Sequence, residues 1–242
     1  MRNATRSDKE HRRGLEDAPV AWSRALRDRV VGAAAIAFVA SVAIENAVLA
    51  GAGAPAFGDP IEEVLAHYHN RGAVAIAVGL VAVYLPLLLV FVTGLHGLVG
   101  RRGGAGADWS RVAVAAGATF SAIFALVNVL QIGLVLSAGG LTEPSPAFEL
   151  AWQVHAAAFA LALPALATTF IGAALAAHAS RLTPPWQCLL GVAGGALLLT
   201  AGVGSLAIAD GSALLFVGLL GFAAWLVWLL ATGVRLVRAR SS

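Results

Sequence analysis

Long apolar runs, without the alternation typical of strands, dominate this sequence. The runs lie at about residues 31–50, 73–99, 112–138, 150–177, 186–208 and 213–234. A helix needs about 20 apolar residues to cross a bilayer, and each run is that long. The pattern therefore predicts an all-α membrane protein, a bundle of six transmembrane helices over residues 31–234 with short loops. Residues 1–30 would form a basic cytoplasmic tail before this bundle, and residues 235–242 a second basic tail after it.

Helix breakers mark the gaps between the runs. Glycine, proline or charged residues gather at residues 51–55, 101–104, 139–146, 184–185 and 210–211. Two prolines, Pro86 and Pro164, lie inside the second and fourth runs instead. A proline there can kink a membrane helix without ending it. We therefore expect six separate helices, two of which contain a proline.

Basic residues are spread unevenly over the segments between the runs. Arg71 is the only one of the 16 Lys and Arg residues that falls in the first, third or fifth loop. Cytoplasmic segments of membrane proteins are enriched in Lys and Arg, so this distribution places both termini in the cytoplasm and the protein in the cytoplasmic membrane. Trp109 and Trp186 at the inner boundary and Trp152 at the outer boundary fit the aromatic belts of such a protein.

Amino-acid composition excludes a soluble protein. Hydrophobic residues make up 59% of the chain and charged residues only 12%, where a soluble domain carries about 25% charged residues. The net charge is +3, and the sidedness of a membrane protein explains this excess of basic residues. We therefore expect a lipid bilayer as the surrounding medium and no nucleic-acid partner. Cys188 is the single cysteine, which excludes an intramolecular disulfide and a cysteine-rich metal cluster.

Glycines in the fifth run are candidates for close helix packing. Gly191 and Gly195 form a GxxxG pair, whose small side chains let two helix backbones approach. We favour contact with another helix of the same subunit. The alternative is a seam with a second copy of the chain or with a partner membrane protein.

Five polar residues lie inside the runs at one depth. They are Glu45 and Asn46 in the first run, Asn128 and Gln131 in the third, and His155 in the fourth. An ionisable side chain within a membrane span costs at least about 2.5 to 3.5 kcal/mol, so it requires a partner or a purpose. Under the predicted topology all five lie in the outer third of the bilayer. We therefore expect them to meet in the folded bundle.

Two interpretations of this polar cluster stay open. Glu45 and His155 could form a titrating pair in a proton, ion or small-molecule site, with Asn128 and Gln131 as orienting groups. The alternative is a hydrogen-bond network that holds the first, third and fourth runs together, which is a common use of such residues in membrane bundles. The first interpretation predicts binding, transport or an accessory role in transport. The second interpretation predicts that the protein is a structural or regulatory partner in the membrane.

The first outer loop contains a weak metal pattern. Glu63 and His67 are separated by one helical turn, and His69 is close by. Carboxylate and imidazole are ligands for zinc or copper. An amphipathic helix lying on the membrane, with Val64 and Leu65 directed inward, explains the same residues and is the interpretation that we favour.

Four histidines near the ends of the runs allow a haem hypothesis. His69 and His155 are close to the outer boundary, and His96 and His178 to the inner one. Such positions would put a haem at the edge of the hydrocarbon region, whereas bis-histidine sites need ligands well inside a bundle. A membrane enzyme or electron carrier with histidine-bound metal or haem is therefore the alternative function, and we predict no cofactor. The sequence contains no HExxH, GxSxG or phosphate-loop motif.

The last run carries a family resemblance. It contains Trp228 near its inner end, followed by Thr232, Gly233 and basic residues, in the stretch LVWLLATGVRL. This end resembles the closing helix of uncharacterised bacterial six-helix membrane proteins that are grouped under a domain of unknown function. The resemblance is confined to this helix and the six-helix layout. It implies the same bundle in a bacterial membrane and transfers no functional residue.

Overall fold

The computed structural model describes the backbone of residues 4–238 and the side chains of residues 25–238. In this part of the chain every regular element is a helix: α1 (Ala4–Gly51), α2 (Ile61–His69), α3 (Arg71–Arg101), α4 (Ala107–Ala138), α5 (Pro146–Ala179), α6 (Pro185–Val203), α7 (Ser205–Ala209) and α8 (Leu214–Arg238). Six of these helices are long and apolar enough to cross a membrane, with the first such span at Ala25–Gly51. The predicted all-α protein with six membrane-length helices is therefore confirmed.

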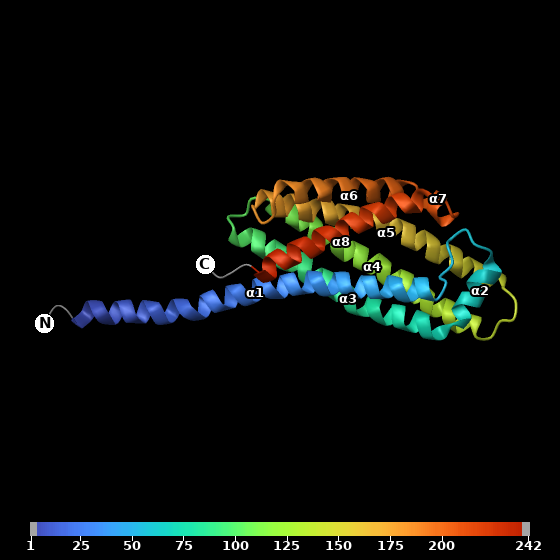
Figure 1. The fold of residues 1–242 in the computed structure, drawn as a ribbon, viewed down its shortest axis with the longest axis horizontal. Coiled ribbons are helices and arrows are strands. Elements are labelled where there is room, and N and C mark those ends of the chain that lie inside the picture. Colours follow the sequence, from blue (N-terminus) through green and yellow to red (C-terminus); the bar gives the residue numbers. More distant parts are fainter. Residues whose placement is uncertain (1–3, 239–242) are drawn as a thin grey trace.

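The six long helices form a closed ring. α1 packs against α3 and α8, α3 against α4, α4 against α5, α5 against α6, and α6 against α8. Figure 1 shows α8 and α1 approaching at the end of the bundle that carries both chain termini, and α2 at the opposite end. We call the end with the chain termini the terminus end, and the end with α2 the cavity end, because the cavity described below lies there. The short loops predicted from the breakers join the helices in this order.

Aromatic side chains fill the middle of the ring. Trp228 is fully buried, with its ring centroid 5.7 Å from that of Phe170 and 6.0 Å from that of Phe91. Trp225 lies 5.0 Å from Phe38 on α1 in an edge-on arrangement. Burial and edge-to-face geometry both favour such pairs. These residues position α1, α3, α5 and α8 around one common core.

Glycines set the closest helix contacts. A Cβ atom at Gly32 on α1 would lie 2.7 Å from the carbonyl oxygen of Gly233 on α8. The GxxxG pair behaves similarly, since Gly191 packs against Ala174 and Gly195 against Ile171, both on α5 of the same chain. Both glycines thus pack against another helix of the same chain.

Two sequence expectations about the helices need correction. The fifth run, expected at 186–208, ends at Val203, and the chain turns at Gly204 before the short α7. A Cβ atom at Gly204 would lie 2.7 Å from Leu214, so α8 packs where a continued helix with larger side chains would clash. Trp152 is buried with 7% exposure and does not form part of an aromatic belt, unlike Trp109 and Trp186, which are 47% and 55% exposed.

The polar N-terminal tail continues into the first span as one helix. α1 runs without a break from Ala4 to Gly51. The predicted sidedness also depends on the basic residues before residue 25 and on Arg240. Their side chains lie outside the part of the chain whose side chains the structure describes. α3 and α5 likewise continue through Pro86 and Pro164.

Candidate functional site

A cavity of about 230 Å³ lies inside the ring at the cavity end. Its lining comes from α1, α2, α3, α4, α5 and α8 and from the segment between α1 and α2. A dry cavity of about 150 Å³ in another protein binds benzene, so this volume suits a small substituted ring. Most of the lining is apolar, with polar groups at a few positions. Those two properties are typical of ligand sites.

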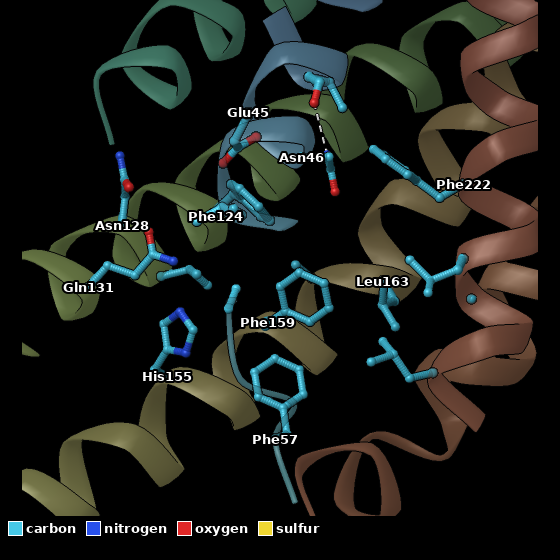
Figure 2. Close-up of a pocket in the computed structure, with 18 of the residues that line it drawn as sticks. Glu45, Asn46, Phe57, Phe124, Asn128, Gln131, His155, Phe159, Leu163 and Phe222 are labelled. Atoms are coloured by element: carbon cyan, nitrogen blue, oxygen red, sulfur yellow. Dashed lines mark hydrogen bonds between the residues drawn. The ribbon is translucent and has the colours of Figure 1, made fainter. Parts of the chain in front are cut away.

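All five residues of the predicted polar cluster line this cavity. Glu45 and Asn46 reach it from α1, Asn128 and Gln131 from α4, and His155 from α5. Figure 2 shows Glu45, Gln131 and His155 around the open centre, with aromatic rings between them. The expectation from depth alone that these residues meet around one region therefore matches their placement.

Glu45 is paired with a residue that sequence reasoning missed. Glu45 is buried with 8% exposure, and its carboxylate lies beside the hydroxyl of Tyr84 on α3, the nearby group that can donate to it. The Tyr84 ring is held against Phe38, with centroids 5.3 Å apart. A signal was present in the sequence, since Tyr84 is one of only two tyrosines and the one inside an apolar run. Among the described residues, Glu45 makes no ion pair with His155.

His155 occupies an aromatic pocket in the cavity wall. Its ring stacks on Trp152, with centroids 5.1 Å apart and planes 16° apart, and Phe57 meets it at 6.0 Å. The residue is 5% exposed, and no described residue hydrogen-bonds to either ring nitrogen. A neutral imidazole has one donor and one acceptor nitrogen. The fold therefore leaves both hydrogen-bonding positions of the His155 ring unused.

Other lining atoms share this property. Asn128 Oδ1, Trp152 Nε1 and His67 Nδ1 are buried and have no hydrogen-bond partner among the described residues. The amide nitrogen of Asn128 donates to the carbonyl oxygen of Val78 on α3, 3.3 Å away, which holds this side chain in place. Buried polar atoms in native proteins are rarely left without a partner, and each one costs about 1 to 3 kcal/mol. The residues around the cavity thus contain buried donors and acceptors that the fold leaves unused.

Asn46 lies at the edge of this arrangement. It is exposed, and its amide donates to the carbonyl oxygen of Val42 in its own helix, 2.9 Å away.

A cap formed by residues 52–60 and α2 covers the cavity end. Val64 and Leu65 are buried against α4 and α5 together with Phe148, so the inward face of the amphipathic α2 packs on protein rather than on lipid. Residues 52–60 extend across to the turn before α8, where a Cβ atom at Gly58 would lie 3.0 Å from Gly211. Burial raises the pKa of the Tyr68 hydroxyl in this cap, so the hydroxyl stays neutral.

The histidine and carboxylate residues of the cap are not gathered into a ligand set. Glu63 is exposed, His67 faces the cavity, and the His69 ring lies 2.9 Å from the carbonyl oxygen of Ala138. Within residues 25–238, no three His, Cys, Asp or Glu side chains form a group that could hold a metal ion. Glu63 is exposed whereas His67 is buried, because Val64, Leu65 and Tyr68 determine which face of α2 packs inward.

The histidines considered for haem have unlike surroundings. His96 Nδ1 lies 2.7 Å from the Ser110 hydroxyl, and His178 is exposed near the terminus end. His69 contacts a backbone carbonyl, and His155 lies in the cavity.

Comparison with known proteins adds no relative. No protein-family model matches the chain, and no curated protein or solved structure matches it significantly. The resemblance of the last helix to six-helix membrane proteins stays a prediction.

Proposed function

We propose that this protein is a multi-pass membrane protein that binds a small molecule in the cavity, as a carrier or as an accessory subunit of a transport system. The lining residues Glu45, Asn128 and His155 would make the polar contacts, with Tyr84 orienting Glu45. Gln131 lies beside them and would supply a further amide.

The proposed orientation has both termini in the cytoplasm and the cavity in the outer half of the membrane. The described basic residues support it, because all but Arg71 lie at the terminus end. They are Arg27, Arg29, Arg101, Arg102, Arg111, Arg181, Arg235 and Arg238. Positive charge is enriched on the cytoplasmic side of membrane proteins. A cytoplasmic membrane of a bacterium is the setting that this proposal implies.

The unpartnered polar atoms of the cavity carry the proposal. If the cluster served only to hold helices together, its polar atoms would bond to one another. The pairs Glu45–Tyr84 and Asn128–Val78 do cross between helices, but His155 contributes no hydrogen bond to any described residue. Polar groups that are fixed around a cavity and unused by the fold favour ligand binding over a purely structural role.

The replacement His155→Phe separates the two roles. Phenylalanine keeps the ring against Trp152 and Phe57 and removes both nitrogens. A binding site predicts unchanged or higher thermal stability, because the removed nitrogens had no partner in the protein. A structural network predicts a lower melting temperature.

Binding itself is tested with a substitution that fills the cavity. Ala162 is buried and lines the cavity, so Ala162→Phe should abolish binding of small ring compounds to the purified protein in lipid nanodiscs. The probes are phenyltrimethylammonium and its uncharged isostere tert-butylbenzene, measured by titration calorimetry against empty nanodiscs. Ala125→Phe on the exposed face of α4 is the matched control. The proposal fails if neither probe binds, or if Ala162→Phe leaves binding unchanged.

A further inference from the structure

The charge of the cavity lining has one sign. Glu45 is the only Asp or Glu that lines the cavity, and no Lys or Arg among the described residues lines it. The partner of its carboxylate is the neutral hydroxyl of Tyr84. A carboxylate within a membrane protein is costly unless another charge compensates it. The lining therefore lacks the cation that would complement Glu45, and a ligand can supply it.

The walls around Glu45 are aromatic. Rings from four helices and the cap line the cavity: Phe57, Tyr68, Tyr84, Phe120, Phe124, Trp152, Phe159 and Phe222. Phe124 and Phe159 lie next to each other, 6.1 Å between centroids, and Phe57 meets Phe159 at 5.3 Å. Aromatic faces attract cations, most strongly where water is excluded, and aromatic cages recognise quaternary ammonium groups in this way. A carboxylate surrounded by rings is thus suited to an organic cation.

The mouth of the cavity lies at its side. Among the lining residues only Asn46 on α1, Ala54 in the cap and Leu219 on α8 are exposed. α1 and α8 are in contact at Gly32 and Gly233 near the terminus end and diverge toward the cavity end (Figure 1). The cap covers the end of the ring. A molecule would therefore reach Glu45 between α1 and α8, on a surface that faces the hydrocarbon region.

We propose that the ligand is a lipophilic organic cation, an amine or quaternary ammonium compound with a compact apolar body. Its charged nitrogen would lie at the Glu45 carboxylate and its body against Phe124, Phe159 and the stacked pair Trp152–His155. Solubility in lipid gives such a molecule access through the mouth between α1 and α8. This inference rests on the proposed function and specifies the class of ligand for the same cavity.

The test compares two isosteres that differ in charge. Phenyltrimethylammonium and tert-butylbenzene have nearly the same shape, and only the first carries a positive charge. We expect wild-type protein in nanodiscs to bind the cation at least tenfold more tightly than the hydrocarbon. In Glu45→Gln, the affinity for the cation should fall at least tenfold, to that of tert-butylbenzene. Glu63→Gln, which changes an exposed carboxylate of the cap, should change neither affinity.

The outcomes distinguish this inference from the proposed function. If wild-type protein binds both probes equally, or binds tert-butylbenzene more tightly, the proposal that the ligand is a cation is overturned. A neutral ligand in the cavity then remains. Tight binding of the cation that persists in Glu45→Gln overturns the role of this carboxylate. If neither probe binds, both proposals fail. The comparison in wild-type protein requires no variant to fold.

Discussion

The two ends of the helix ring are built from different residues. At the terminus end, small residues bring the helices into direct contact, as at Gly32 with Gly233 and at Gly94 with Val31. At the cavity end, aromatic residues such as Phe159 keep the helices apart around a polar centre. Small residues allow close backbone packing in membranes, whereas large rings leave space where their shapes do not interlock. The contrast separates an end with close helix contacts from an end that contains a cavity.

Polar side chains at the two ends differ in the same way. At the terminus end the Gln187 amide donates to the Thr232 hydroxyl at 3.3 Å, which joins α6 to α8, and His96 meets Ser110 at 2.7 Å. Gln187 Oε1, Thr183 Oγ1 and Trp228 Nε1 are also without a partner among the described residues, but none of these residues lines the cavity. At the cavity end, His155 joins no helices by hydrogen bonds. Polar groups of similar type thus serve packing at one end and line a space at the other.

The largest effect should come from opening the contact at the terminus end. In Gly32→Leu the new side chain must displace the Gly233 backbone and Leu236, so α1 and α8 separate. We expect a loss of about 3 kcal/mol or more in the free energy of unfolding, at the upper end of overpacking effects. Thermal unfolding in detergent measures it. Gly133→Leu is the control, because nothing lies within 4 Å of a Cβ atom at that position; equal destabilisation of the two variants would contradict this account of the terminus end.

A smaller effect should follow from removing the hydroxyl of Tyr84 that lies beside the Glu45 carboxylate. Tyr84→Phe keeps the ring against Phe38 and leaves the buried carboxylate without its donor. We expect a loss of about 1 to 2 kcal/mol, the cost of an unpaired buried acceptor. Tyr68→Phe is a control, since burial acts on its hydroxyl but no carboxylate lies beside it.

A double-mutant cycle with Glu45→Gln then isolates the pair. Coupling below about 0.5 kcal/mol, the range found for independent sites, would show that Tyr84 does not orient Glu45.

The smallest effect concerns the ion pair that joins α1 to α3 at the terminus end. Asp28 Oδ1 accepts from Arg101 at 2.8 Å, and about a third of each side chain is exposed, at 31% and 34%. Asp28→Asn should therefore cost less than about 1 kcal/mol, with a difference that disappears at high salt. Unfolding at two ionic strengths measures this, with Asp108→Asn as the exposed control. A larger loss that is independent of salt would give Asp28 a packing role.

Much of the fold could be predicted because membrane helices have a strong local pattern. Six apolar runs account for all six long helices, and the polar residues at one depth all face one cavity. The two incorrect expectations, the end of α6 and the exposure of Trp152, concern positions whose structure depends on side chains of neighbouring elements. Gly204 ends α6 because Leu214 packs beside it, and Trp152 is buried because α2 and the cap cover it. Neither contact is visible in a local pattern.

The sequence by itself determined the number of membrane-length helices, their order and the depth of the polar residues, because length and hydropathy act within each segment. Only the tertiary structure decided which residues pair and where space is left. It joined Glu45 to Tyr84 across 39 positions of sequence, placed His155 against Trp152 and Phe57, and left a cavity of about 230 Å³ between them. Helix rotation and separation depend on side chains of all neighbours at once, and no single run contains that information.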